Sequence, residues 1–129
     1  MTWSAEVEEL ERRREFALQM GGPEGIARQH LNDKLTVRER LDLLADPGSF
    51  REFMGLAGEG TYGESGELVH FRPKASVEGL LKLDGRKVVV SAGDFTVRGG
   101  SGGGRGSGGM GTELPANQRA LQWRLPFVR

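Results

Sequence analysis

The first part of the chain carries apolar residues at helical spacing, separated by many charged positions. Residues 4–20 are predicted to form one helix that docks through a narrow apolar stripe, while its charged positions are solvated and paired at i, i+4 spacing. Ser4 suits the N-cap position, and the Gly-Gly-Pro sequence of residues 21–23 ends the helix. The pattern therefore predicts an exposed, largely polar first helix.

Two shorter helices are predicted between residues 24 and 45. The second begins after Thr36, and Glu39 lies three residues further on, which is the spacing of a capping box. Leucines on one face of this helix predict packing against a neighbouring element. The Asp-Pro-Gly-Ser sequence of residues 46–49 is typical of a turn, because proline fixes φ and glycine adopts positive φ.

The spacing changes to a β pattern in the middle of the chain. Residues 50–53 are predicted to be extended, whereas residues 55–74 are glycine-rich, weakly patterned and expected to form a long surface connection. Residues 76–83 and 86–91 are predicted to be two strands joined by an Asp-Gly turn at 84–85. This hairpin is the strongest local structural signal in the sequence.

A glycine-rich segment follows the second of these strands. Asp94 is expected to accept backbone hydrogen bonds that shape the turn between the strand and the glycine-rich loop. A loop with few side chains allows the backbone to approach a ligand closely. Beyond it, residues 115–123 are predicted to form a short helix, and residues 124–128 to lead into another strand.

Composition narrows the functional classes. The 129 residues suit one domain, and 18 basic residues balance 18 acidic ones, which argues against a polyanion-binding protein overall. The balance is uneven, because five arginines and a single acid, Glu113, follow Phe95. No apolar run reaches the roughly 18 residues of a membrane span, and no signal-peptide core is present. A cytoplasmic protein without a membrane partner is therefore expected.

Residues that could carry side-chain chemistry are few. The sequence contains no cysteine, which excludes disulfides, a thiol nucleophile and thiolate metal ligands. His30 and His70 are the only histidines, and their positions do not have the spacing of metal ligands. His30 is expected to pack or cap locally within its helix. No catalytic residue and no metal ligand are assigned.

Three blocks of sequence carry a family signature in their order and spacing. The motifs are GG at 21–22, RQH at 28–30, KLTVRERL at 34–41 and DPGSF at 46–50; VEG at 77–79, DGR at 84–86 and VVV at 88–90; and DFTVRGGSG at 94–102. This pattern resembles the N-terminal part of the carboxyltransferase (beta) subunit of biotin-dependent acyl-CoA carboxylases, of the propionyl-CoA and methylcrotonyl-CoA carboxylase type. The resemblance runs from about residue 8 to the last residue.

The resemblance implies an α+β fold of the crotonase type, in which β-β-α units repeat. The chain is then an incomplete N-terminal fragment of that fold with leading helices. Residues 1–49 are expected to form the N-terminal helical segment, and residues 50–129 the start of a truncated carboxyltransferase N-domain. The family also implies a homo-oligomer in the intact protein.

The family reaction implied by the resemblance transfers a carboxyl group from carboxybiotin to the α-carbon of an acyl-CoA. The biotin is carried on a partner, the biotin carboxyl carrier or biotin carboxylase subunit, and is not bound covalently to this chain. Paired backbone N–H groups stabilise the oxyanions, without a metal or a side-chain nucleophile. The resemblance places the Gly-Gly or Gly-Ala pair that forms the oxyanion hole of the N-domain just beyond Arg129. Residues 1–129 alone are therefore expected to be inactive.

The expected acyl-CoA contacts lie in the glycine-rich loop. They comprise Arg98, Gly99, Gly100, Ser101 and Gly102, where the backbone can approach the phosphates or the pantetheine arm and an arginine can assist electrostatically. A flexible linker is the alternative interpretation of such a loop when it is taken alone. The DFTV sequence in front of it favours ligand contact.

Two other functions stay open at this point. The chain could be a non-catalytic binding or assembly module that associates with full-length carboxylase subunits. The cluster at residues 38–40 (Arg-Glu-Arg) could then be a subunit contact, or simply a charged helix surface. The weaker alternative is a Gly/Arg-rich RNA binder, which is disfavoured because no aromatic residue lies between Phe95 and Trp123. No nucleic-acid partner is therefore expected.

Overall fold

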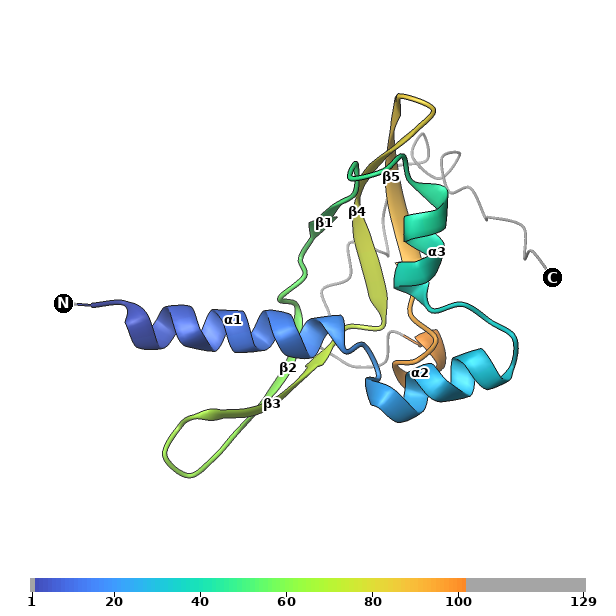
Figure 1. Cartoon of the computed structure of the whole chain (residues 1–129). Helices are drawn as coiled ribbons and strands as arrows, with labels where there is room; N and C mark the ends of the chain where they lie inside the picture. Colours follow the sequence, from blue (N-terminus) through green and yellow to red (C-terminus); the bar gives the residue numbers. More distant parts are fainter. Residues whose placement is uncertain (1, 102–129) are drawn as a thin grey trace.

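The structure is a computed structural model, and it describes residues 2–101 (Figure 1). Three helices come first and five strands follow, as the sequence predicts for the leading helices and the central hairpin. They are α1 (Ser4–Leu18), α2 (Gly22–Leu31), α3 (Val37–Leu44), β1 (Arg51–Phe53), β2 (Gly58–Tyr62), β3 (Leu68–Pro73), β4 (Ser76–Leu83), β5 (Arg86–Gly93) and the short 3-10 turn η1 (Arg98–Gly100). The helix predicted at 115–123 and the strand predicted at 124–128 lie outside the described residues.

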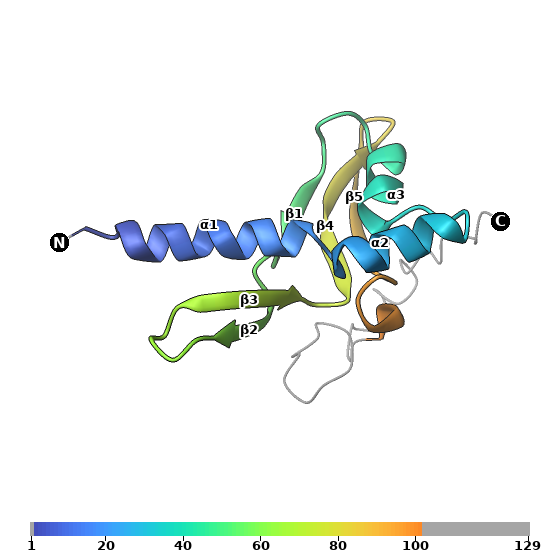
Figure 2. The ribbon, with the colours of Figure 1, turned by 60° about the horizontal axis from the view of Figure 1, so that its bottom comes forward.

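The principal core lies between α3 and an antiparallel sheet of order β1-β4-β5. Val37 and Leu41 of α3 are buried against Val77 and Leu81 of β4 and Val90 of β5. Alternate residues of β4 are buried, since successive side chains of a strand point to opposite faces. Of the leucines predicted to form the apolar face of the third helix, Leu41 and Leu44 pack in this core, whereas Leu43 is 77% exposed. Helix α3 lies along β5 in both views of the ribbon (Figures 1 and 2).

Two turns meet at one end of this sheet. The predicted Asp-Gly turn joins β4 to β5, and both Asp84 and Gly85 have positive φ, 48° and 78°, as a type I′ turn requires. The carboxylate of Asp46 accepts hydrogen bonds from the backbone N–H groups of Asp84 and Gly85, at 2.9 and 2.8 Å. The turn that follows α3 therefore fastens the helix to the hairpin.

The capping box predicted at the start of α3 is confirmed. The hydroxyl of Thr36 accepts the N–H of Glu39 at 3.3 Å, and the Glu39 carboxylate accepts the N–H of Thr36 at 2.7 Å. The same carboxylate lies 2.9 Å from Nε2 of His30, at the end of α2. His30 therefore bonds to a residue of the next helix, nine positions away, and does not cap its own helix as expected. These hydrogen bonds lower the pKa of Glu39 to about 2, the one to His30 contributing most.

The prediction of a long surface connection at residues 55–74 is wrong. These residues contain an antiparallel hairpin, β2 and β3, in which Leu68 and Phe71 are each only 1% exposed. The register shifts between Thr61 and Tyr62, and such a bulge breaks the alternation of apolar and polar positions that identifies a strand. Gly58 favours a loop in the sequence pattern. In β2, however, a glycine is needed at this position, because a Cβ there would lie 2.2 Å from the Arg72 carbonyl oxygen.

Helix α1 covers this hairpin, as Figure 2 shows. Ala17 packs with Leu68 and Phe71, and the rest of α1 is largely exposed, as its narrow apolar stripe predicts. Its arginines are not all solvated, however: Arg12 donates to the Leu68 carbonyl oxygen at 2.6 Å, and the Arg13 guanidinium lies 5.6 Å from the Phe71 ring centroid. Part of the charged surface of α1 therefore holds the hairpin.

Replacing Leu81 with alanine tests the core between α3 and the sheet. Leu81 is 1% exposed, so we expect a loss of about 2–5 kcal/mol in the free energy of unfolding, from lost burial and a residual cavity. Urea denaturation followed by circular dichroism measures it. Val89→Ala is the control, because Val89 is 72% exposed and should change stability by less than about 0.5 kcal/mol. Equal effects of the two substitutions would contradict this core.

The Glu39 carboxylate gives a prediction for acidic pH. Its pKa is lowered in the folded chain from 4.5 to about 2, so its stabilising contribution is complete above pH 4.5 and is lost as the pH falls towards 2. An NMR titration of the side-chain carbonyl carbon should show this midpoint. His30→Gln should raise the pKa of Glu39, whereas His70→Gln should leave it unchanged. An ordinary midpoint in the unmodified chain would refute the network.

Candidate functional site

The DFT sequence that follows β5 forms a buried hydrogen-bonded turn. Asp94 is 2% exposed, and its Oδ1 atom accepts the N–H of Thr96 at 3.0 Å and the hydroxyl of Thr96 at 2.6 Å. Its own N–H donates to the carbonyl oxygen of Ala75 at 2.9 Å. The role expected for Asp94, shaping the turn by accepting hydrogen bonds, is confirmed.

Thr96 continues this network to the corner between α1 and α2. Its Oγ1 atom accepts the N–H of Gly21 at 2.9 Å. A Cβ on Gly21 would lie only 1.9 Å from the Thr96 carbonyl oxygen, and one on Gly25 would lie 3.2 Å from it. Glycine is therefore required at 21 for the close approach of two backbone segments that are 75 positions apart.

The predicted acyl-CoA loop begins directly after this turn. Arg98, Gly99 and Gly100 all have positive φ, of 46°, 62° and 74°, and the Ser101 hydroxyl donates to the Arg98 carbonyl oxygen at 2.6 Å. The N–H groups of Gly100 and Ser101 are donated within the loop, to Val97 and Arg98. The loop thus offers a surface with few side chains. Gly102 lies outside the described residues.

Beside this loop lies a hollow with a volume of about 260 Å³. Sequence reasoning did not find it, because its walls come from the end of α1, the α1–α2 corner, β3 and the segment before the glycine loop. The lining residues are Phe16, Gln19, Met20, Gly21, Gly22, His70, Arg72, Thr96, Val97 and Arg98. The rings of Phe16 and His70 meet edge to face, with centroids 5.1 Å apart. Among the predicted site residues at 98–101, Arg98 lines the hollow.

Two charged side chains line the hollow, and a third pairs with both of them from outside its lining. The carboxylate of Glu59, on β2, pairs with Arg72 and lies 3.3 Å from a guanidinium nitrogen of Arg98. The hydrogen bond from Arg72, and then the charges of Arg72 and Arg98, lower the pKa of Glu59. Within residues 2–101, two guanidinium groups and one carboxylate therefore lie beside the glycine loop.

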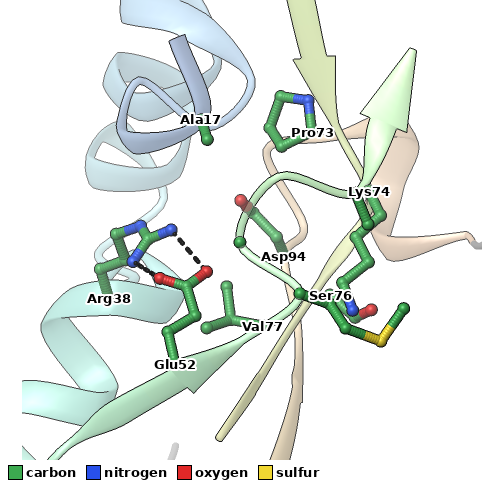
Figure 3. A pocket seen from close by; sticks show the side chains of 11 residues that line it. Ala17, Arg38, Glu52, Pro73, Lys74, Ser76, Val77 and Asp94 are labelled. Atoms are coloured by element: carbon green, nitrogen blue, oxygen red, sulfur yellow. Dashed lines mark hydrogen bonds and ion pairs between the residues drawn. The ribbon is translucent and has the colours of Figure 1, made fainter. Parts of the chain in front are cut away.

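A second depression lies between α3, β1 and the turn before β4, and its volume is only about 10 Å³ (Figure 3). On one side of it, Arg38 and Glu52 form a bidentate ion pair of 2.9 and 3.0 Å. Burial lowers the pKa of Lys74 on its far wall. A space of this volume holds about one water, so this depression is a structural junction.

The arginines at 38 and 40 therefore differ in surroundings. Arg38 ties α3 to β1 through Glu52, Glu39 caps the helix, and Arg40 is exposed. A subunit contact through this cluster stays a prediction, with Arg40 as the residue available for it.

Across residues 2–101, no group of three His, Cys, Asp or Glu side chains is placed to hold a metal ion. None of the described helices is long and apolar enough to span a membrane.

The sequence matches a known family model over most of its length. The model described as the carboxyl transferase domain matches residues 28–128. The chain therefore belongs to the carboxyl transferase domain family, as the three motif blocks predicted.

Several curated relatives show which kind of carboxyltransferase it resembles. The propionyl-CoA carboxylase carboxyltransferase subunit of Haloferax mediterranei is 41% identical over 101 residues, covering 78% of this chain and 20% of that protein. The mitochondrial propionyl-CoA carboxylase beta chain of Rattus norvegicus is 42% identical, covering 73% and 18%. The probable biotin-dependent acyl-coenzyme A carboxylase beta2 subunit of Mycobacterium tuberculosis is 34% identical, covering 98% and 22%. The chain thus spans about a fifth of the length of these relatives.

Solved structures support the fold. A hexameric transcarboxylase 12S with methylmalonyl-coenzyme A and methylmalonic acid bound superposes with a TM-score of 0.62 at 34% identity, covering 78% of this chain and 20% of that one. A second structure of the same protein, with hydrolysed methylmalonyl-coenzyme A bound, gives a TM-score of 0.64 and covers 80% and 20%. The predicted class, an α+β fragment of a crotonase-like carboxyltransferase, is confirmed.

Thr96→Val tests the connection between the DFT turn and the α1–α2 corner. The substitution keeps the shape of the side chain but removes the hydroxyl that joins Asp94 to Gly21. We expect the free energy of unfolding to fall by about 1–3 kcal/mol, because a buried carboxylate loses a donor. Thr61→Val, on an exposed position of β2, is the matched control for urea denaturation. If both variants unfold at the same urea concentration as the unmodified chain, the connection is not stabilising.

Proposed function

We propose that these residues form the acyl-CoA-binding start of a carboxyltransferase subunit. The transferred group would come from carboxybiotin on a carrier or biotin carboxylase partner, and its acceptor would be the α-carbon of the acyl-CoA. Family membership supports this proposal, as does the similarity to transcarboxylase 12S, whose structures contain methylmalonyl-coenzyme A or its hydrolysed form. The observation that carries it is the buried turn at Asp94 and Thr96, after which the glycine loop lies beside a hollow lined by Arg72 and Arg98.

Within this site, the residues have different tasks. Gly99 and Gly100 leave room for close approach of the pantetheine arm, since neither presents a side chain. Arg98 contributes positive charge for a phosphate, and Ser101 extends the contact surface. Gly102 is proposed as a further contact on the sequence motif alone. Gly21, Thr96 and Asp94 position the loop through hydrogen bonds and close backbone approach. None of these residues is proposed as an acid, base or nucleophile.

The carboxyl transfer itself is proposed for the assembled subunit, and not for these residues alone. The chain spans about a fifth of the length of the relatives it matches. In the intact protein we propose a homo-oligomer, in which further residues supply the N–H groups that stabilise the oxyanions. The acyl-CoA is then the ligand that the described residues contact, and biotin is delivered by the partner.

An assembly role is the second candidate, and one observation favours it. Helix α1 packs on the β2-β3 hairpin but extends away from the β1-β4-β5 sheet (Figures 1 and 2). Trp3, just before it, and three residues within it have exposed apolar side chains: Trp3, Val7, Leu10 and Leu18 are 67, 52, 42 and 59% exposed. Exposed apolar side chains favour protein contacts. Association with a full-length carboxylase subunit without acyl-CoA binding would favour this role over the first.

Gly100→Ala tests acyl-CoA binding at the loop. Gly100 has a φ of 74°, so a side chain there both strains the backbone and narrows the approach. We expect the dissociation constant for propionyl-CoA, measured by isothermal titration calorimetry, to rise about tenfold. Gly85→Ala is the control, because Gly85 has a similar φ of 78° in a turn at the opposite end of β5. Equal binding by both variants and the unmodified chain would exclude the loop as a ligand site.

A further inference from the structure

The hollow beside the glycine loop has one apolar wall and one cationic wall. Phe16 and Met20 contribute to the apolar wall, and Arg72 and Arg98 form the cationic wall. Its described lining residues include no aspartate or glutamate. The Glu59 carboxylate, which pairs with Arg72 and Arg98, lies outside this lining.

The donors available to a ligand in this hollow are side chains. The N–H of Gly21 is donated to Thr96 Oγ1 at 2.9 Å, and the N–H of Gly22 to the Gln19 carbonyl oxygen at 2.8 Å. Backbone groups at the start of α2 are therefore occupied. Recognition then depends on guanidinium groups, whose planar arrangement of N–H donors matches the oxygens of phosphate.

In the structure, the Glu59 carboxylate is a counter-ion of both guanidinium groups. It pairs with Arg72 and with Arg98, although the Glu59 side chain is 60% exposed. Ion pairs of this exposure contribute little to stability, so they exchange readily for another anion. A phosphate dianion carries more charge than a carboxylate and presents more acceptor oxygens, which favours such an exchange.

We propose that this hollow binds a phosphate group, free or as an ester, and that Glu59 is the internal carboxylate that the phosphate displaces from Arg72 and Arg98. The volume of about 260 Å³ supports this assignment, since it accommodates several water molecules at about 30 Å³ each. Assigning the phosphate to coenzyme A rests on the function proposed above. Binding of free phosphate does not depend on that function.

Three single substitutions in the full 129-residue chain test the site, with pyrophosphate as the probe in calorimetric titrations at low salt. Arg72→Gln removes a guanidinium from the cationic wall and should weaken binding about tenfold or more. Glu59→Gln removes the competing carboxylate and should tighten binding about two- to fivefold. Arg86→Gln, at the β4–β5 turn, is the control and should leave affinity unchanged.

The direction of the Glu59→Gln effect decides between binding and structural roles. If Glu59 only maintained the fold, its replacement would weaken binding, and that result would overturn the proposal. A decrease with Arg86→Gln as large as with Arg72→Gln would also overturn it, since it would show attraction by surface charge alone. Circular dichroism of each variant establishes that the fold is retained.

The source of the phosphate is tested separately with propionyl-CoA and pantetheine as competitors. Displacement of pyrophosphate by propionyl-CoA but not by pantetheine assigns the hollow to the phosphates of coenzyme A. Pyrophosphate binding that depends on Arg72 but is not displaced by propionyl-CoA keeps the phosphate site and removes its link to acyl-CoA. Propionyl-CoA binding that is unaffected by Arg72→Gln overturns the hollow as its phosphate site, while the glycine-loop function stands.

Discussion

The hydrogen bonds that join Asp94, Thr96 and Gly21 organise the described structure. A carboxylate that is 2% exposed must be satisfied by donors, and here the N–H and hydroxyl of Thr96 supply them. The Thr96 hydroxyl can then accept the N–H of Gly21, so the end of β5 is fixed to the corner between α1 and α2. Because these segments are 75 positions apart in sequence, this connection closes the long loop between the helical start and the glycine-rich segment.

Two small cores lie on either side of this connection. One packs α3 on the β1-β4-β5 sheet, and the other packs α1 on the β2-β3 hairpin. The hollow lies where the second core meets the glycine loop, since β3 contributes Arg72 and the loop contributes Arg98. The position of the hairpin therefore sets the charge beside the loop, and Glu59 on β2 couples the two through ion pairs.

The family assignment and the physical description support each other. Motifs that identify a carboxyltransferase prove to be contacts of the fold: Gly21 allows the close approach, Thr36 and Glu39 cap α3, and Asp46 holds the β4–β5 turn. These motif residues therefore stabilise the fold. The residues that we propose contact a ligand are Arg98 and its neighbouring glycines, together with Arg72 from the hairpin.

The sequence alone determined the elements whose signals are local. The capping box at Thr36, the Asp-Gly turn and the helical spacing before residue 45 depend on neighbours within four positions, and the motif blocks identified the family. Only the tertiary structure decided the rest. The β2-β3 hairpin was missed because its bulge breaks the alternating pattern and its burial depends on α1. The hollow was missed because Arg72 and Arg98 are brought together by Glu59 and the packing of β3, which no spacing in the sequence records.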